Sequence, residues 1–346
     1  MAPDLEYKTR VLTDTAQLVG IQNEWRDLCK RSSGVTPFQD PEWVISWADT
    51  FSPERMRVIE VRSGGLLVGL APFLIYRRGE ERVLAFMGGG ISDYLDLLVD
   101  GQCEGEALFA IFHAIRSLDE WTTVDLTDLR PNSVLLRTEL ARFAALHDRC
   151  SSFRLPATRE ELLQNLSKRQ RANLRQAHSR IQKAGDARVE AAKPDTLTEF
   201  LEDLFRLHAS RWIRAGQPGV LADEKVQAFH RKATPELLAH GILRLYRLRL
   251  NHQTLAVLYA LFGESTVFCY LQGYHPDFAA LSPGTYLMFA VMEDAILSRM
   301  SRFDLLRGEE GYKQHWRAQA EATYRISLSH NALPALLSMS WQTEAA

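Results

Sequence analysis

The sequence has few cysteines, no long apolar run and almost no net charge. Four cysteines in 346 residues form no C-x-x-C pair and lie far apart, at Cys29, Cys103, Cys150 and Cys269. This usage argues against a disulfide framework and against a cysteine metal site. Apolar runs such as residues 66–75 are far shorter than the roughly 20 residues of a membrane span, and the first ten residues lack an apolar signal region. We therefore expect a cytoplasmic protein without membrane insertion.

The motifs of several common enzyme classes are missing as well. Ten histidines occur without H-x-x-x-H spacing, and neither G-x-S-x-G nor a phosphate-binding P-loop is present. These absences argue against a metalloenzyme, a serine hydrolase and an NTPase, and we expect no bound metal. The net charge of −2 argues against extensive contact with nucleic acid, so we expect no DNA partner.

What is present is an α/β pattern that occurs twice along the chain. In the first half the spacing of apolar residues predicts helices over 15–31, 41–51 and 105–118 and near 132–147. Strands are predicted over 81–90, 94–100 and 121–129, and a hairpin over 55–78 turns at Ser63-Gly64-Gly65. In the second half a hairpin over 241–264, a strand over 265–275, a helix over 282–300 and strands over 302–308 and 322–329 repeat that order. The repetition predicts a duplicated α/β unit, and two halves of similar order by chance are the alternative.

A basic segment, LSKRQRANLRQAHSRIQKAG (166–185), lies between the halves. It has six Lys and Arg residues and no acidic residue before Asp186, while Leu166, Leu174, Ala177 and Ile181 form one narrow apolar stripe. This pattern predicts an amphipathic helix that ends at Gly185. Its cations are suited either to a phosphate-bearing partner or simply to solvent.

The segment 272–287, QGYHPDFAALSPGTYL, is the clearest candidate for a binding site. It predicts the end of a strand, a loop, and a helix with Ser282 as N-cap and Pro283 in the first turn. The free backbone N–H groups there, with Gly284 allowing close approach, are suited to a pyrophosphate or a carboxylate. The alternative is an ordinary helix start without a ligand.

The second candidate is RFDLLRGEEGYKQHW (302–316), in which a predicted strand ends at Gly308. The side chains with candidate catalytic chemistry are Asp304, Glu309, Tyr312 and Lys313. Glu309 or Glu310 is suited to accept a proton, and Tyr312 and Lys313 are suited to polarise a carbonyl or to balance developing negative charge. The alternative is a helix start with acidic first-turn residues and a solvated lysine.

Two further segments are candidates for substrate binding. GGGISDYLDLL (88–98) places three glycines before Ser92, Asp93 and Tyr94, where the backbone allows close approach or forms a bulged strand edge. RLHASRWIRAGQPG (206–219) offers Arg211 and Trp212 near the end of a predicted helix, a pair suited to an anionic or sugar-like group.

These motifs, taken in order, resemble a known family. A strand, SPGTYL, a helix, FDLLRG and YKQHW, preceded by the basic SKRQRANLRQA helix, resemble the acyltransferases of the GNAT superfamily. The resemblance is strongest to the CelD-type group, named for cellulose biosynthesis and related to FemAB peptidyltransferases. It extends from TPFQDPEWVISW (36–47) to Trp316 and is densest over 166–185 and 270–316.

The resemblance implies two tandem GNAT-like modules with mixed, mostly antiparallel sheets, a degenerate first module over 1–160 and a second module over 161–346 with the donor-binding loop. It implies transfer of an acyl group from a thioester to an amine of a small molecule or of an envelope or polysaccharide precursor. No permanently bound cofactor is implied, and acyl-CoA is the implied co-substrate.

The resemblance also implies roles for individual residues. The donor phosphates are assigned to Ser282, Gly284, Thr285 and Tyr286, and Lys313 lies in the motif that FemAB-type enzymes use near the reacting carbonyl. The resemblance places Asp93 and Tyr94, which follow Ser92 in an SDY segment, beside the substrate. The other predicted substrate-binding residues are Arg211, Trp212, Tyr270 and Gln272.

One departure from the family concerns the donor loop, which has a single glycine where GNAT enzymes usually have Q/R-x-x-G-x-G/A. A carrier protein or an aminoacyl-tRNA therefore stays open as the donor, and so does a non-catalytic scaffold in polysaccharide assembly.

Overall fold

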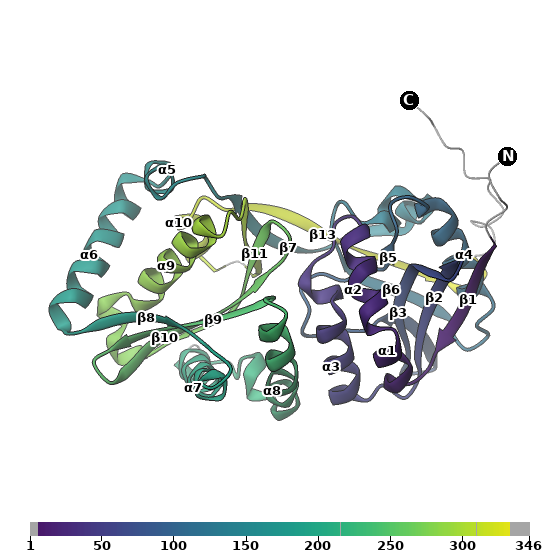
Figure 1. The fold of residues 1–346 in the computed structure, drawn as a ribbon, viewed down its shortest axis with the longest axis horizontal. Coiled ribbons are helices and arrows are strands. Elements are labelled where there is room, and N and C mark those ends of the chain that lie inside the picture. The colour runs from purple at the N-terminus through teal and green to yellow at the C-terminus, as the bar shows by residue number, and fades with distance from the viewer. Residues whose placement is uncertain (1–5, 215, 309, 333–346) are drawn as a thin grey trace. The chain divides into compact units, whose positions relative to one another are not determined.

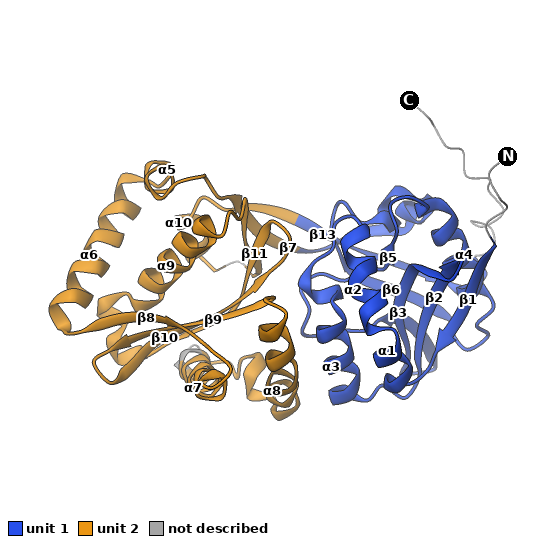
Figure 2. Cartoon of the chain, viewed as in Figure 1, with its two compact units in different colours: residues 1–148, 322–346 blue, residues 149–321 orange. Residues whose placement is uncertain are grey.

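The computed structural model describes residues 6–214, 216–308 and 310–332, and its ribbon is drawn in Figure 1. The chain forms two compact units: residues 1–148 with 322–346, and residues 149–321 (Figure 2). The first unit is therefore built from two separate stretches of sequence, because strand β13 near the C-terminus lies mostly within it. The module limits predicted from the sequence, 1–160 and 161–346, stay a prediction, and the two compact units change over at residue 149 and again at residue 322.

The first unit contains a six-stranded mixed sheet. Its strands are ordered β1 (Tyr7–Leu12), β2 (Met56–Ser63), β3 (Leu66–Arg78), β4 (Glu81–Phe86), β6 (Thr123–Leu129) and β13 (Gln319–Ser329), and the short β5 (Leu98–Val99) pairs with β3. These strands pair in antiparallel fashion, except that β4 and β6 are parallel. The helices are α1 (Thr15–Gly20), α2 (Gln22–Arg31), α3 (Pro41–Phe51) and α4 (Glu104–Arg116).

The helix expected near 132–147 is wrong. That region forms two short 3-10 turns, η2 (Val134–Arg137) and η3 (Glu139–Phe143), followed by strand β7 (Ala144–Arg154). The hydroxyl oxygens of Ser133 and Thr138 accept hydrogen bonds from backbone N–H groups two residues further on. Such local capping competes with a continuous helix, so each turn ends after a few residues.

The second unit contains a six-stranded sheet with helices on both faces. Its strands are ordered β7, β12 (Arg302–Arg307), β11 (Thr266–Tyr274), β10 (Gln253–Phe262), β9 (Leu243–Leu250) and β8 (Ala187–Ala191). The helices are α5 (Arg159–Asn165), α6 (Lys168–Ala184), α7 (Leu197–Arg214), α8 (Glu224–Ala239), α9 (Pro283–Leu297) and α10 (Tyr312–His315). Figure 1 shows α6 and α9 on one face of this sheet and α7 and α8 on the other.

The predicted repetition is visible in the strand order. In the first unit a hairpin, β4, α4 and a parallel β6 follow one another, and in the second unit a hairpin, β11, α9 and a parallel β12 do the same. Antiparallel pairing dominates both sheets, as expected from the sequence. None of the helices in the described part of the chain combines the length and the apolar character that crossing a membrane requires.

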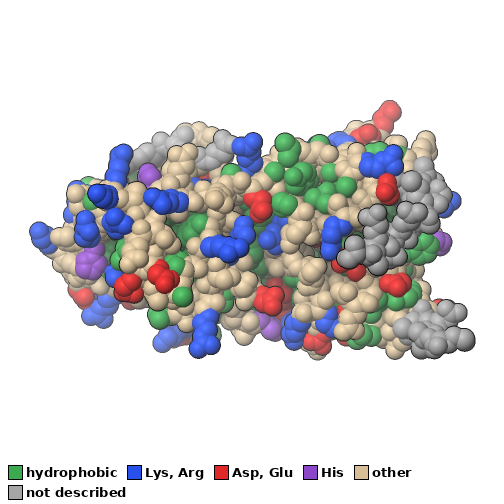
Figure 3. Space-filling model, turned by 90° about the horizontal axis from the view of Figure 1, so that it is seen from above, with side chains coloured by type: hydrophobic (Ala, Val, Ile, Leu, Met, Phe, Trp, Pro, Cys, Tyr) green, Lys and Arg blue, Asp and Glu red, His purple; other side chains and the backbone are tan. Residues whose placement is uncertain are grey.

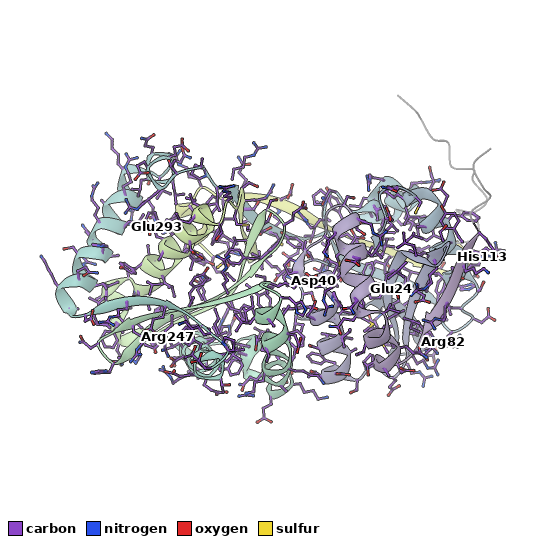
Figure 4. The ribbon with its side chains drawn as sticks, viewed as in Figure 1. Glu24, Asp40, Arg82, His113, Arg247 and Glu293 are labelled. Carbon is purple, nitrogen blue, oxygen red and sulfur yellow. The ribbon has the colours of Figure 1, made fainter. Side chains whose placement is uncertain are left out.

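A buried arginine, Arg247, links the sheet of the second unit to helix α7. The Arg247 side chain, on β9, is only 4% exposed and lies toward α7 (Figure 4). Its guanidinium donates to Glu190 on β8 at 2.9 Å, and to Glu199 at 2.6 Å and Asp203 at 3.2 Å on α7. Such a paired cation fixes α7 against the sheet, because any rearrangement would leave charge unpaired in the interior.

Candidate active site in the second unit

The site begins where two neighbouring parallel strands separate. The register of β11 with β12 covers only Thr266–Phe268 against Arg302–Asp304, although both strands continue. The β10–β11 ladder has a bulge beside this point, since Tyr259 pairs with Leu271 but Ala260 pairs with Cys269. A bulge increases local bending and twist, so β11 turns away from β12 after Phe268 and opens a space at the carboxyl ends of both strands.

A pocket of about 320 Å³ lies at this position, near the lower end of the usual size for small-molecule sites. Its walls come from β11, α9, α10 and α6. The lining residues are Gln170, Gln272, Tyr274, Ala279, Ser282, Pro283, Gly284, Thr285, Met288, Tyr312, His315 and Trp316. The two segments singled out in the sequence, 272–287 and 302–316, therefore meet at one pocket.

The N-terminus of α9 forms one wall of the pocket. Ser282 is the N-cap, as predicted, but its hydroxyl makes no capping hydrogen bond, and its backbone is left-handed with φ 55°. Pro283 contributes no N–H, and no acidic residue lies in the first turn. A side-chain methyl at Gly284 would meet only Tyr274 Cδ1, at 3.9 Å. The helix end therefore presents backbone N–H groups and positive partial charge without a side chain competing for them.

The corresponding helix of the first unit, α4, has a different N-terminus. α4 has Gly105 in the same second position as Gly284 of α9, but Glu104 and Glu106 flank it in the first turn. These carboxylates already complement the helix dipole and would repel an incoming phosphate. The first turn of α4 is therefore less suited to a phosphate than the first turn of α9.

Lys313 has a different environment from the one expected for a lysine that faces substrate. Its side chain is 5% exposed, and its ammonium donates to the carbonyls of Leu306 (3.0 Å), Arg307 (2.6 Å) and Gly308 (2.9 Å). The Glu310 carboxylate lies 3.0 Å from the same nitrogen. Lys313 therefore holds the turn by which β12 leaves the sheet, and this turn carries Tyr312 of the pocket wall.

The other predicted catalytic residues lie around this turn. The buried Asp304 accepts a hydrogen bond from the Leu306 N–H at 2.8 Å, and Leu306 has the left-handed φ of 57°. Glu309 lies outside the described residues. Tyr286 does not line the pocket, and its ring packs 5.9 Å from His178 of α6. The catalytic assignments of Asp304, Glu309 and Lys313 stay predictions.

Two predicted substrate-binding residues lie on the α7 and α8 face of the second unit. The Tyr270 ring, in the bulge of β11, packs 5.7 Å from His230 of α8 and 5.4 Å from Tyr259. Trp212 donates its indole N–H to His208 Nε2 at 2.8 Å. The side chain of Arg211 lies outside the described part. Neither Tyr270 nor Trp212 lines the pocket, whereas Gln272 does.

The remaining predicted residues belong to the first unit. Ser92 is fully buried, and its hydroxyl oxygen accepts a hydrogen bond from the Trp43 indole at 2.9 Å. Tyr94 is buried, with the Arg130 guanidinium 5.1 Å from its ring centroid, and Asp93 is half-buried. Gly88 has φ 93°, and a side chain there would collide with Ser92 Oγ. This segment thus has a packing role, and its assignment to substrate stays a prediction.

Gln170 is a pocket residue that the sequence did not reveal. It is 3% exposed and belongs to the basic helix α6. The signal is visible in retrospect, because Gln170 continues the buried stripe of Leu174, Ala177 and Ile181 as its one amide. A buried amide needs polar partners, so a glutamine in an apolar stripe is a signal of a nearby polar site.

Comparison with known proteins agrees with this geometry. Residues 168–314 match the model of the acetyltransferase (GNAT) domain, a range that contains the whole pocket except Trp316 and His315. The chain has a GNAT-type fold. This match supports a transferase and confirms the family resemblance at the level of the fold. No curated protein sequence matches the chain significantly.

Solved structures show the same fold over nearly the whole chain. FemX aligns with a TM-score of 0.67 and 12% identity, over 96% of this chain and 100% of FemX. L-PGS from Bacillus licheniformis aligns with a TM-score of 0.57 and 11% identity, over 91% of this chain and 94% of that chain. A tandem GNAT protein from the clavulanic acid biosynthesis pathway aligns with 0.51 and 14%, over 94% and 99%. The predicted tandem GNAT architecture is confirmed as a fold.

Proposed function

We propose that the protein is an N-acyltransferase that moves an acyl group from a pantetheine thioester to an amine. Acyl-CoA is the thioester that the family resemblance implies. The observation that carries this proposal is the pocket between the separating ends of β11 and β12, with the uncapped N-terminus of α9 at its wall. A narrow pocket of this kind fits an extended thioester arm, and the helix terminus fits a phosphate at its end.

The reaction requires a bond exchange at one carbonyl carbon. The amine nitrogen bonds to the thioester carbon, the carbon–sulfur bond breaks, the amine loses a proton and the departing thiolate gains one. Tyr312 is the proposed proton donor to the sulfur, because it lines the pocket at the turn that Lys313 holds. Positioning of the two reactants supplies much of the acceleration in such a site.

Two other functions stay open from the sequence. FemAB-like transfer from aminoacyl-tRNA is the first, and the similarity of the fold to FemX fits it. A non-catalytic scaffold in polysaccharide assembly is the second. The acceptor on our proposal is an amine of a small molecule or of an envelope or polysaccharide precursor.

The test is a mass-spectrometric screen of the purified protein with acyl-CoA donors and pools of amines, with Tyr312→Phe as the variant. We expect an acylated amine and free thiol with the wild type and a large loss of kcat with Tyr312→Phe. Acyl-CoA at 100 times its Kd should also stabilise the fold by about 2.7 kcal/mol. Neither product nor stabilisation with any acyl-CoA or acyl-pantetheine would overturn the proposal, and product formation only with charged tRNA would favour the FemAB-like function.

A further inference from the structure

The exposed side of α6 carries a set of cations without acidic partners. Five of its Lys and Arg side chains are exposed and form what we call the basic face: Lys168, Arg169, Arg175, Arg180 and Lys183. The helix contains no acidic residue. Among ion pairs between described residues, none involves the basic face, and only Arg180 makes a described side-chain bond, to the Ala280 carbonyl.

The charge is concentrated in the unit that holds the pocket. Residues 149–321 contain 25 Lys and Arg against 19 Asp and Glu, although the whole chain has a net charge of −2. Figure 3 shows Lys and Arg side chains gathered at the end of the molecule where α6 lies. Unpaired like charges on one helix are unfavourable by themselves, so a partner of opposite charge would relieve them.

The same helix forms a wall of the donor pocket. Gln170, on its inner side, lines the pocket within one turn of Lys168 and Arg169 on its outer side. Because Leu174 and Ile181 belong to the apolar core of this unit and α6 packs on α9, the helix is fixed and cannot rotate its cations inward. A donor that enters this pocket is therefore held beside the basic face.

The length of the basic face along α6 indicates how large its partner is. From Lys168 to Lys183 the helix advances about 22 Å. The phosphates of one small donor molecule cannot contact cations at both ends of such a span, and the pocket itself, of about 320 Å³, accommodates only an arm of the donor. The partner is therefore a macromolecule that places an arm in the pocket and an anionic surface on α6.

The composition of the basic face narrows the class of macromolecule. No large apolar side chain is exposed on α6, which an interfacial membrane helix would need. The one exposed ring on the helix, His178, already packs against Tyr286, so the face offers no stacking platform for bases. What remains is a broad helix face of cations, which complements an acidic helix of a folded protein.

We propose that the acyl donor reaches this enzyme on an acidic carrier protein, whose anionic helix docks on the basic face while its phosphopantetheine arm enters the pocket. This inference rests on the proposed function and specifies its donor. The bond exchange is unchanged: the amine takes the acyl group, the carbon–sulfur bond breaks, and the carrier leaves with a free, protonated thiol.

The test compares two donors that share the arm and differ in the carrier. The probes are a bacterial acyl carrier protein loaded with acyl groups from acetyl to dodecanoyl, and the matching acyl-pantetheines. The variant combines Arg169→Glu, Arg175→Glu and Lys183→Glu, none of which lines the pocket. We expect kcat/KM for the loaded carrier to fall about 10- to 100-fold, since exposed ion pairs contribute up to about 1 kcal/mol each. The value for acyl-pantetheine should not change.

A matched variant controls for charge alone. Lys193→Glu, Lys225→Glu and Arg299→Glu reverse three exposed cations of the same unit that lie off α6, and we expect them to leave both donors unaffected. Rising ionic strength should weaken transfer from the carrier but not from acyl-pantetheine.

Each of the other possible outcomes contradicts a specific part of the proposal. Equal use of the two donors by the wild type, or equal losses of both in the α6 variant, would overturn the carrier and leave the acyltransferase standing. Absence of transfer from either donor would overturn the acyltransferase itself. Tighter binding of tRNA or of phosphatidylglycerol vesicles than of the carrier, lost in the α6 variant, would assign the basic face to that polyanion instead.

Discussion

Replacement of Lys313 by methionine removes a buried charge from the turn that ends β12. Methionine keeps the unbranched shape of the side chain but cannot donate, so the carbonyls of residues 306–308 each lose a hydrogen bond of 2.6–3.0 Å. The Glu310 carboxylate loses the ion pair of its buried Oε2, but the side chain is 35% exposed and can turn toward water. Breaking a buried pair costs about 3–5 kcal/mol, and rehydration of the partner places this variant near the lower end, about 3 kcal/mol.

The loss should be local, because the affected groups all lie in one turn. We expect faster hydrogen exchange of the amides in 306–316 and a lower midpoint of urea unfolding, and lower kcat through misplacement of Tyr312. Glu310→Gln is the matched control, and because that carboxylate is partly solvated, we expect its cost to stay below about 1 kcal/mol. The experiment pairs urea unfolding and hydrogen exchange with acyl-transfer kinetics.

One result would refute this reasoning. If Lys313→Met kept the wild-type unfolding midpoint and wild-type exchange in 306–316 while transfer was lost, Lys313 would act on substrate and not on the turn. A variant that lost neither stability nor activity would deny it both roles.

Three further substitutions test other parts of the structure. Gly284→Ala adds a methyl group where only Tyr274 is near, so this variant should fold normally and raise the KM for the donor about tenfold. Gly105→Ala, at the matching position of α4, should leave this KM unchanged. Equal KM values in the two variants would contradict a donor site at α9. Burial lowers the pKa of His230 to about 3 from 6.5, so the unfolded chain binds the proton first and stability falls as the pH drops below 6.5. Between pH 7 and pH 5 this amounts to about 2 kcal/mol, and urea unfolding at both values should show a smaller loss in His230→Phe than in the wild type. Arg247→Met should cost about 3–5 kcal/mol by urea unfolding, against little for the more exposed Arg249→Met. Equal effects would show that the buried guanidinium of Arg247 does not hold α7 against the sheet.

The sequence predicted those parts of the site whose signal is local. Pro283 in a first turn and Gly284 after it identify the start of α9 because both residues have few other uses at that spacing. The hairpins and the strand after α9 were predicted for the same reason, since turn residues and alternation suffice to define them.

Features that depend on distant partners were not predictable in this way. The hydrogen bonds of the buried Lys313 to backbone carbonyls depend on a left-handed turn at Leu306. Leucine rarely adopts this conformation, so the sequence does not predict it. The position of Gln170 in the pocket depends on how α6 packs on α9. The error near 132–147 had the opposite cause, because the apolar spacing was helical but Ser133 and Thr138 capped the backbone locally.

The return of the chain to the first unit has a consequence for biosynthesis. β13 pairs with β6 over Tyr324–Ser329, and Ile326 and Leu328 belong to the first unit's apolar core. About 200 residues separate the two strands, and a contact this distant in sequence closes late. While the ribosome is still adding residues 149–321, β6 has an open edge and the first core lacks one side. We expect the second unit to complete its fold first, although it is synthesised second, with nascent chains shorter than about 330 residues exposing that edge to chaperones.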